Sequence, residues 1–353
     1  MSNTAGLYIH IPFCRRKCLY CDFYSVPLED ILAERYAETV VRNIRAYGGK
    51  FDTVYFGGGT PVLLADKLGK MLSVADIAYG AEITAECNPC EMTSDALELL
   101  KNAGINRISV GVQSFDDNEL KALGRRHDAE TAERAILIAR EAGFDNISAD
   151  LMLGIPQQTP ESLARTLDKL CSLPITHISA YMLKIEPSTP FGTNTPETPD
   201  EDSTADMYLQ AVKRLAESGF AQYEISNFSK DGCECAHNLK YWRREEYLGI
   251  GPAAHSFYGG RRFEVARDIE EFLSSPRQLE ITNDISPDEY EERVMLGLRL
   301  SEGIPEELYK PLLKGLALVP RNYYRLENGR LSLTAEGFLV SNEIISLLLS
   351  RME

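Results

Sequence analysis

Three cysteines near the N-terminus, Cys14, Cys18 and Cys21, constrain this chain more than any other feature. They follow an apolar, β-prone run at residues 8–13 and have the spacing C-x3-C-x2-C. Three thiolates can hold three irons of a cubane 4Fe–4S cluster, whereas four are needed to saturate it. If no fourth thiolate arrives, one iron stays open to a substrate or cofactor, as the open position of a catalytic zinc does. The three cysteines therefore predict an iron–sulfur site that performs chemistry.

Two other interpretations of these cysteines stay open. Zinc sites usually combine a C-x2-C pair with a second pair or with histidines. Here His10 precedes the cysteines within a probable strand, so a closed zinc knuckle fits poorly. Free structural cysteines are the other alternative, because unpaired cysteine is often buried as a small apolar residue.

The stretch around the cysteines resembles the radical S-adenosylmethionine (SAM) superfamily, in which this spacing follows the first strand. The flanking sequences YIHIPFC and YCDF narrow the resemblance to the branch of anaerobic coproporphyrinogen III dehydrogenases and HemW heme chaperones. The resemblance implies that a reduced cluster passes one electron to SAM bound at the open iron. The sulfonium then breaks into methionine and a 5′-deoxyadenosyl radical, while the protein positions SAM and excludes water.

Short β-type runs alternate with helical patterns from residue 7 to about residue 186. The expected strands lie at residues 7–13, 53–56, 81–85, 108–112, 147–153 and 177–183, and the expected helices include residues 31–46, 94–102, 131–142 and 161–170. This alternation predicts a parallel sheet with helices outside it. Six units are too few for a closed eightfold barrel. The resemblance implies an α/β fold, namely an open (β/α)6 partial barrel with its chemistry at the C-terminal ends of the strands.

A run of glycines follows the second expected strand: Gly57, Gly58 and Gly59, with Thr60 after them. Glycines let the backbone approach a ligand closely, and exposed amides can hold a carboxylate or an amine. Alone, three glycines are more often only a turn. One strand–helix unit after the cysteine loop, they match the superfamily motif for the methionine end of SAM.

Polar residues stand at or just beyond the ends of the next strands, where ligand groups belong in such folds. They are Glu86, Gln113, Arg125 and Asp150. The resemblance implies that these four contact SAM and that Tyr8, on the first strand, lies near the cluster and the cofactor. Taken singly, each is equally a strand-end cap or a surface ion pair, and Arg126 is the neighbouring alternative to Arg125.

A second motif, residues 237–242, reads HNLKYW and contains the only tryptophan of the chain. It matches the HNxxYW motif that is associated with heme binding in this branch. The resemblance makes His237 a candidate heme-binding residue, with Cys235 as an alternative or additional ligand. From the residues alone, a histidine beside aromatic side chains is more often packed than ligating.

We expect three regions: the partial barrel at residues 1–230, the HNxxYW segment and a connecting region at 231–286, and a C-terminal domain at 287–353. In the last region a helix at residues 288–300 precedes a hairpin around Asn328-Gly329 and a helix at 338–349, which suggests a winged-helix-like α+β module. Because this module is acidic, we interpret it as a cap or a partner surface.

Within this branch, residue 23 separates two functions. The dehydrogenase pattern has a further cysteine two positions after the third, and Phe23 stands there. Together with HNxxYW, this favours a heme chaperone that binds a 4Fe–4S cluster, SAM and heme and passes heme to an acceptor hemoprotein. The alternative is the dehydrogenase of porphyrin biosynthesis, which decarboxylates coproporphyrinogen III to protoporphyrinogen IX. Whether the chain is an enzyme stays open. An electron donor such as flavodoxin or ferredoxin is an expected partner.

Charge and hydropathy limit the other partners. A net charge of −16 repels phosphate backbones, so we expect no nucleic acid partner. No apolar run reaches the roughly 18 residues of a membrane-spanning helix, although peripheral association stays open. The first ten residues lack a basic segment before an apolar one, so we expect no secretory signal and a cytoplasmic protein.

Overall fold

The computed structural model describes residues 4–282 and 288–352. A curved sheet of twelve strands dominates it, in the order β14-β13-β12-β11-β1-β4-β5-β6-β7-β8-β10-β9. The predicted strands form its centre and are all parallel: β1 (Ala5–Ile11), β4 (Lys50–Gly58), β5 (Asp76–Cys87), β6 (Arg107–Gln113), β7 (Asn146–Leu153) and β8 (His177–Met182). The prediction of an α/β fold with an open, mostly parallel sheet is confirmed.

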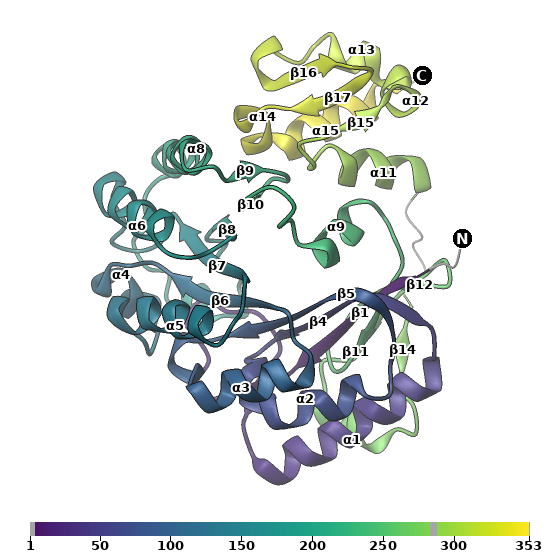
Figure 1. The fold of residues 1–353 in the computed structure, drawn as a ribbon. Helices are drawn as coiled ribbons and strands as arrows, with labels where there is room; N and C mark the ends of the chain where they lie inside the picture. The colour runs from purple at the N-terminus through teal and green to yellow at the C-terminus, as the bar shows by residue number, and fades with distance from the viewer. Residues whose placement is uncertain (1–3, 283–287, 353) are drawn as a thin grey trace.

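Helices cover the convex face of this sheet (Figure 1). They are α1 (Asp30–Tyr47), α2 (Ala65–Leu72), α3 (Ser94–Ala103), α4 (Asp117–Ala122), α5 (Ala129–Glu141) and α6 (Pro160–Ser172). Alternate residues of each strand face these helices. In β7, for example, Ile147, Ala149 and Leu151 are fully buried in the apolar core. Because side chains alternate along a strand, Ser148 and Asp150 face the concave interior instead. The interior of the barrel is therefore the polar face.

Both edges of the sheet contain strands beyond the six predicted units. On one side lies a hairpin of β9 (Ala221–Gln222) and β10 (Asn227–Ser229). On the other side β11 (Tyr247–Ile250) lies parallel to β1, followed by the antiparallel β12 (His255–Tyr258), β13 (Arg261–Val265) and β14 (Glu280–Ile281). Part of the region expected only to connect the two domains thus extends the main sheet. These strands are too short to show a clear two-residue period in the sequence.

The barrel region also contains the long helix α8 (Glu201–Glu217) and several short elements: β2 (Phe13–Cys14), β3 (Val26–Pro27), α7 (Pro190–Thr193), α9 (Ala236–Trp242) and α10 (Ile269–Ser274). Helix α9 contains the HNxxYW motif and lies on the concave side of the sheet (Figure 1).

A smaller α+β unit follows the barrel. It contains α11 (Glu289–Gly297), β15 (Ile304–Pro305), α12 (Glu306–Tyr309), α13 (Leu313–Leu316), β16 (Tyr324–Glu327), β17 (Arg330–Leu333), α14 (Ala335–Leu339) and α15 (Ser341–Ser350). The three strands form a separate antiparallel sheet, and Asn328 and Gly329 form the turn of the predicted hairpin with positive φ angles. The expected domain boundary at 286–287 lies outside the described residues. None of the helices in the described part of the chain has the length and apolar character to cross a bilayer.

Backbone hydrogen bonds continue from the β1–β4 pair into the loops that follow it. The Gly59 amide donates to the Ile11 carbonyl oxygen at 2.8 Å, and the Thr60 amide donates to the Phe13 carbonyl oxygen at 2.8 Å. A Cβ atom on Gly59 would lie only 2.6 Å from the Phe13 oxygen. Only glycine therefore allows the glycine run to lie against the start of the cysteine loop.

We expect Gly59→Ala to lower stability by roughly 1–3 kcal/mol, because two backbone segments must separate to admit the methyl group. Gly69→Ala is the matched control. Gly69 lies within α2, and a Cβ there would make only an ordinary contact of 3.5 Å with Ala103. This change should stabilise the chain by roughly 0.5–1 kcal/mol through helix propensity. Thermal unfolding of the full chain measures both, and equal midpoints for the two variants would contradict the steric argument.

Candidate functional site

The three cysteines of the N-terminal motif lie on one wall of a single cavity. Cys14 ends β2, and the chain turns between Cys18 and Cys21, where the Cys21 amide donates to the Cys18 carbonyl oxygen at 3.3 Å. The cavity, which we call the site cavity, has a volume of about 550 Å³ and opens at the C-terminal ends of the barrel strands. Most of the predicted site residues line it: Cys14, Cys18, Cys21, Gly58, Gly59, Thr60, Glu86, Gln113, Arg125 and Asp150.

The thiols are held by neighbours from other loops. The Cys14 sulfur lies 3.4 Å from the Thr60 hydroxyl, and the Cys18 sulfur accepts a hydrogen bond of 3.4 Å from the Arg125 guanidinium. Burial raises the pKa of Cys14 and raises the pKa of Cys21 to about 11. Thiolates at these positions therefore need a bound cation, and metal coordination supplies one.

Among the described residues, no three His, Cys, Asp or Glu side chains converge closely enough to hold a single metal ion. A cubane distributes its irons over separate corners, so its three cysteine ligands stand farther apart than the ligands of one ion. The cysteine loop contributes three soft thiols to the site cavity, Cys14, Cys18 and Cys21, and soft thiol donors suit an iron–sulfur cluster.

The glycine run forms the wall next to the cysteines. Gly58 has a φ of +104°, and a Cβ atom on it would lie 2.6 Å from the His10 ring. Together with the close approach at Gly59, this leaves a floor of bare backbone in the site cavity. Gly57 lies behind that floor, where a Cβ would meet the rings of Tyr55 and Tyr8 at 3.0 Å.

Two carboxyl groups face the cavity from β5 and β7. Glu86 accepts hydrogen bonds from the Tyr55 hydroxyl at 3.0 Å and the Gly58 amide at 3.1 Å, and Asp150 accepts one from the Ser109 hydroxyl at 3.0 Å. Burial is the largest cause that raises the pKa of Glu86 to about 7 and of Asp150 to about 6, and the Asp150 charge adds to the shift at Glu86. A cationic ligand would favour the ionised form of both groups.

Gln113 and Arg125 complete the opposite wall. Gln113 ends β6 with a φ of +71° and accepts a hydrogen bond of 2.9 Å from the Tyr181 hydroxyl. Arg125 donates to the Gly111 carbonyl oxygen at 2.5 Å and lies against the cysteine loop. Arg126 points away from the site cavity and pairs with Glu91 at 2.6 Å. Of the two neighbouring arginines, only Arg125 lines the cavity.

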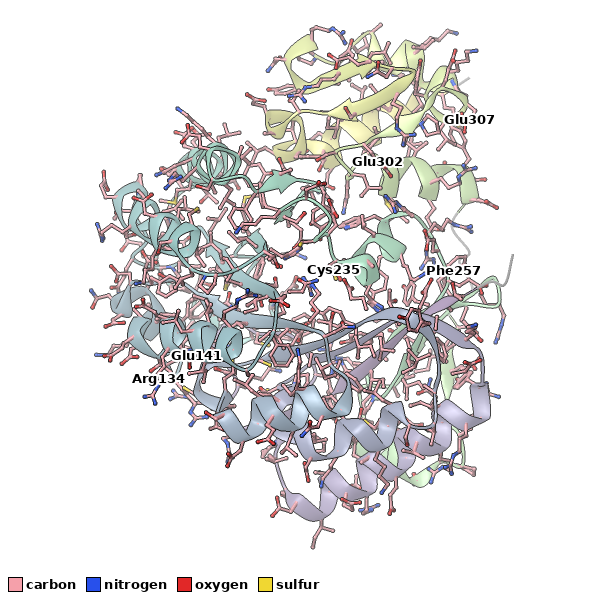
Figure 2. The ribbon with its side chains drawn as sticks, in the orientation of Figure 1. Arg134, Glu141, Cys235, Phe257, Glu302 and Glu307 are labelled. Carbon is pink, nitrogen blue, oxygen red and sulfur yellow. The ribbon has the colours of Figure 1, made fainter. Side chains whose placement is uncertain are left out.

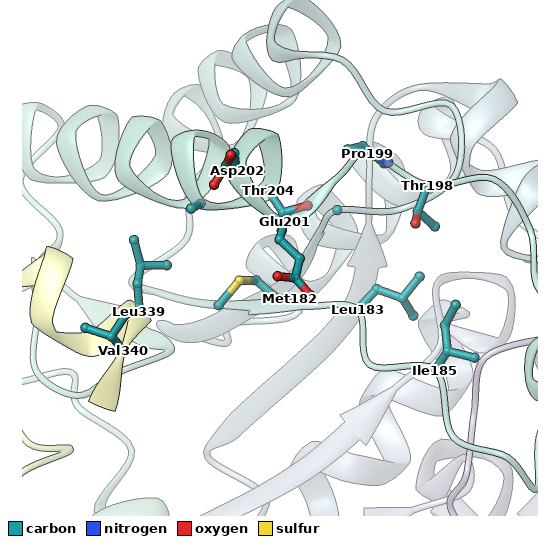
Figure 3. Close-up of a pocket in the computed structure, with 12 residues that line it drawn as sticks. Met182, Leu183, Ile185, Thr198, Pro199, Glu201, Asp202, Thr204, Leu339 and Val340 are labelled. Atoms are coloured by element: carbon teal, nitrogen blue, oxygen red, sulfur yellow. The ribbon is translucent and has the colours of Figure 1, made fainter. Parts of the chain in front are cut away.

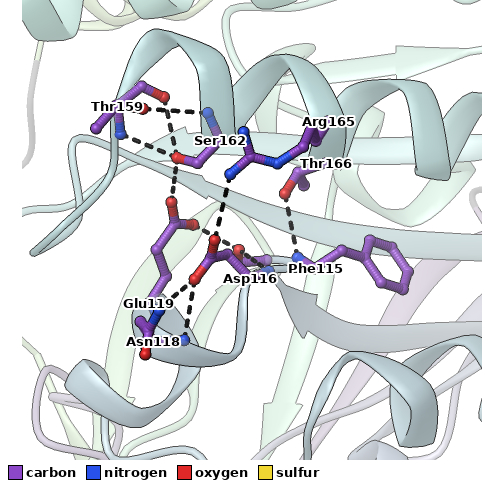
Figure 4. Close-up of polar contacts among 9 residues, drawn as sticks. Phe115, Asp116, Asn118, Glu119, Thr159, Ser162, Arg165 and Thr166 are labelled. Carbon is purple, nitrogen blue, oxygen red and sulfur yellow. Dashed lines mark hydrogen bonds and ion pairs between the residues drawn. The ribbon is translucent and has the colours of Figure 1, made fainter.

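A buried polar network fixes the loop after Gln113 (Figure 4). Glu119 on α4 accepts hydrogen bonds from Ser114 and from Ser162 at the start of α6. The Phe115 amide donates to the Thr166 hydroxyl at 3.2 Å. The turn that gives Gln113 its unusual backbone angle is therefore held from both sides by helices, which keeps its side chain aimed into the cavity.

Tyr8 and His237 do not line the site cavity. The Tyr8 ring stacks on Tyr55, which does, with centroids 6.2 Å apart. His237 on α9 is fully buried, and both of its ring nitrogens are engaged: Nδ1 lies 2.8 Å from the Thr53 hydroxyl and Nε2 lies 2.8 Å from the Tyr241 hydroxyl. Burial lowers the pKa of His237 to about 3. To coordinate iron, His237 would have to break at least one of these hydrogen bonds.

Cys235, the alternative heme ligand, is equally enclosed. It lies just before α9 on the inner side of the barrel (Figure 2) and is fully buried. Its sulfur lies 3.5 Å from the Glu82 carboxylate, which also accepts hydrogen bonds from the amides of Ala236 and His237. Glu82 thus caps α9, and burial raises the pKa of Cys235 to about 12, so this thiol stays protonated.

The cavity also contains residues that the sequence analysis did not select. Tyr20, Tyr55, Tyr181 and Asn88 line it. The inward positions of Tyr55 and Tyr181 could have been found from strand alternation, whereas the other two lie in loops with no such period. Asn88 has a buried Oδ1 atom and Arg125 a buried Nε atom, and neither has a hydrogen-bond partner in the structure.

These observations test whether the residues fit a cluster with SAM. The cavity volume lies within the usual range of about 300–1,000 Å³ for small-ligand sites. Orphaned polar atoms at Asn88 and Arg125 call for ligand or water partners. Three thiols, a bare glycine floor and two buried carboxyls match a site for an iron–sulfur cluster and a cationic, amine-bearing cofactor. The residues fit.

Comparisons with known proteins agree with this geometry. Residues 8–170 match the family model described as the radical SAM superfamily. The chain is 33% identical to a heme chaperone HemW of Bacillus subtilis, over 98% of this chain and 99% of that protein. It is 38% identical to a heme chaperone HemW of Escherichia coli, over 85% and 84% of the two chains.

Among solved structures, the coproporphyrinogen III oxidase HemN of Escherichia coli, a radical SAM enzyme, has a TM-score of 0.82 at 22% identity. The match covers 98% of this chain and 90% of that one, and at this identity it shows the fold. The sequence identity to the two HemW relatives, over 98% and 85% of this chain, shows the family as well as the fold. This chain belongs to the HemW family of the radical SAM superfamily.

Proposed function

We propose that Cys14, Cys18 and Cys21 hold a 4Fe–4S cluster in the site cavity and leave one iron open. Cys87 is the other cysteine among the described residues that line this cavity. It is buried on β5, and its thiol points to the Ala85 carbonyl oxygen at 3.7 Å. A fourth protein thiolate is therefore not offered to the cluster, and the open iron remains for a cofactor.

The proposed cofactor at the open iron is SAM. The bare backbone of Gly58 and Gly59, with Thr60, would receive its methionine end, with Gly57 supporting this floor from behind. Gln113 and Arg125 would bind its polar groups. The carboxylates of Glu86 and Asp150 would offset its positive charge in the buried site. When bound, the cluster and SAM together supply one-electron chemistry, and the chain's own residues bind, orient and shield the cofactor.

At the level of the whole protein, we propose a heme chaperone that binds heme and passes it to an acceptor hemoprotein. The observation that carries this is the likeness, over almost the full length of both chains, to a curated heme chaperone. Phe23 supports it, because the dehydrogenase pattern has a cysteine at this position. Phe23 stands at the edge of the site cavity with 63% of its surface exposed.

The second candidate function is oxidative decarboxylation of coproporphyrinogen III. The fold likeness to HemN favours it, because a TM-score of 0.82 extends over 98% of this chain. A shared fold does not determine the reaction, which depends on the residues at the site. We place it second because Phe23 occupies the position of the further cysteine.

We expect Cys18→Ser to abolish the iron–sulfur chromophore of the anaerobically reconstituted protein, because a hydroxyl is a poor replacement for a thiolate on iron. Iron content should fall from about four atoms per chain to near zero. Cys171→Ser, on the outer helix α6, is the matched control and should retain both. Unchanged iron content in Cys18→Ser would refute the cluster.

We expect the affinity for SAM to rise with pH between about pH 6 and about pH 8. Below the raised pKa values of Glu86 and Asp150, about 7 and about 6, both carboxyls are neutral and offer no countercharge. Each group that must ionise before SAM binds raises the affinity for SAM by up to about tenfold per pH unit, as long as the pH is below the pKa of that group. Equilibrium dialysis with the reconstituted protein measures this.

Glu86→Gln should weaken SAM binding and flatten its pH dependence. Glu133→Gln, a surface variant on α5 that loses only an ion pair with Lys169, should keep the wild-type profile. An affinity for SAM that is the same across this pH range in the wild-type protein would contradict the assigned role of the carboxylates.

For the whole protein, hemin added to the reconstituted chain should give a saturable Soret change, and an apo-hemoprotein added afterwards should take up the heme. Coproporphyrinogen III, supplied with SAM and a reductant, should remain unconverted. The absence of hemin binding removes the chaperone proposal, and measured formation of protoporphyrinogen IX would replace it with the second function.

A further inference from the structure

The HNxxYW helix α9 forms part of the wall of the site cavity. Asn238, the residue after His237 on this helix, lines the cavity. His237 contacts Thr53 and Tyr55, two alternate residues of β4 that lie on the same face of the sheet. Because Tyr55 also lines the site cavity, its side chain touches both His237 and the space assigned to SAM.

The rings of His237, Tyr55 and Tyr8 form a tight group, which we call the aromatic cluster. His237 stacks on Tyr55 with centroids 5.3 Å apart and an interplanar angle of 28°, and Tyr8 lies 6.2 Å from Tyr55 and 6.5 Å from His237. A Cβ atom on Gly6 would lie 3.0 Å from the His237 ring, and one on Gly57 would lie 3.0 Å from the other two rings. The backbones of β1 and β4 therefore leave the cluster little free space on the sheet side.

Tyr55 also holds a carboxyl group that the proposed function assigns to SAM. Its hydroxyl donates to one oxygen of Glu86 at 3.0 Å, and the Gly58 amide donates to the other oxygen at 3.1 Å. Both oxygens are thus fixed by groups of β4 before a ligand arrives. Such preorganisation lowers the cost of binding, because the carboxylate does not have to be ordered when SAM enters.

His237 has to leave the aromatic cluster in order to bind heme iron. Its two ring nitrogens are engaged with the hydroxyls of Thr53 and Tyr241, and its side chain is fully buried. The macrocycle of heme lies across the bond from iron to a histidine ligand and needs open space around that bond, which a closely packed core does not provide. A heme that binds through His237 therefore draws this ring away from Tyr55.

A second cavity provides no comparable heme ligand. It has a volume of about 480 Å³ and lies between the end of β8, the start of α8 and the C-terminal α+β unit (Figure 3). It shares Met182 and Leu183 with the site cavity. Two threonines and two acids contribute to its lining, and among the described residues no histidine or aromatic side chain does. A ligand bound there would not touch the aromatic cluster.

We propose that Tyr55 couples heme binding at the HNxxYW helix to SAM binding, so that each ligand weakens the binding of the other. This inference rests on the proposed heme-chaperone function and adds its regulation. When His237 leaves the cluster, the Tyr55 ring loses a stacking partner, and its hydroxyl no longer fixes Glu86 beside the sulfonium. SAM fixes Glu86 and, through it, Tyr55, which keeps His237 in the core. Binding of SAM therefore favours the release of heme to an acceptor.

The test is a pair of titrations of the anaerobically reconstituted full chain. SAM binding is measured by equilibrium dialysis with and without saturating hemin, and hemin binding by Soret absorbance with and without saturating SAM. We expect hemin to weaken SAM binding about tenfold, and SAM to weaken hemin binding by the same factor, because coupling between two sites is reciprocal. The effect should level off once the chain is saturated with hemin, whereas competition for one space would keep growing with the hemin concentration.

Tyr55→Phe keeps the stacked ring and removes the hydroxyl. It should weaken SAM binding in the absence of hemin and abolish the effect of hemin on SAM binding. Glu86→Gln, which removes the countercharge at the other end of the same hydrogen bond, should also lose the effect of hemin. Tyr290→Phe is the matched control and should retain it, since Tyr290 on α11 donates to the Leu308 carbonyl oxygen at 2.6 Å and lines neither cavity.

Three results would overturn the coupling. They are an affinity for SAM that saturating hemin does not change, an effect of hemin as large in Tyr55→Phe as in the wild-type chain, and an effect that grows without limit as hemin is added. If the wild-type chain binds no hemin, the heme-chaperone function itself fails. Hemin that binds equally well with and without SAM leaves that function intact and overturns only the coupling.

Discussion

The site depends on the backbone contact between the two N-terminal strands and the loops that follow them. Parallel pairing of β1 and β4 extends past the strand ends, where the amides of Gly59 and Thr60 bond to the carbonyl oxygens of Ile11 and Phe13. These hydrogen bonds place the cysteine loop and the glycine run side by side. Because the two loops touch through their backbones at these hydrogen bonds, the thiols of the cysteine loop and the amides of the glycine run can face one ligand.

Several charged and polar side chains of the barrel interior are buried away from bulk water. Glu86 and Asp150 have raised pKa values because of burial, and the Arg107 guanidinium is also buried, with its Nε atom unpartnered. Unpaired buried charges are costly, so such an interior is reasonable only if a ligand or ordered water completes it. The HNxxYW helix α9 contributes to this interior through the hydrogen bonds of His237 with Glu82 and Thr53, and Asn238 of the same helix lines the site cavity.

Much of the barrel could be predicted from the sequence. The six central strands show runs of apolar residues, and β7 alternates between Ile147, Ala149 and Leu151 outward and Ser148 and Asp150 inward. The strands β11 to β14 could not be predicted in the same way. They have two to five residues each, and their pairing partners lie more than two hundred residues away at β1 or next to one another at the sheet edge. Such contacts are decided by packing and leave no local period.

The sequence by itself determined which chemical groups are available for a ligand site: three closely spaced thiols, a glycine run and polar residues at strand ends. Spacing and residue type carry this information, because ligand preferences are properties of the side chains. Only the tertiary structure decided which of these residues share a cavity. It brought Arg125 rather than Arg126 to the cysteines, enclosed His237 within a hydrogen-bonded core, and left Met182 exposed. Burial and side-chain direction arise from contacts between distant segments, and these contacts exist only once the chain has folded.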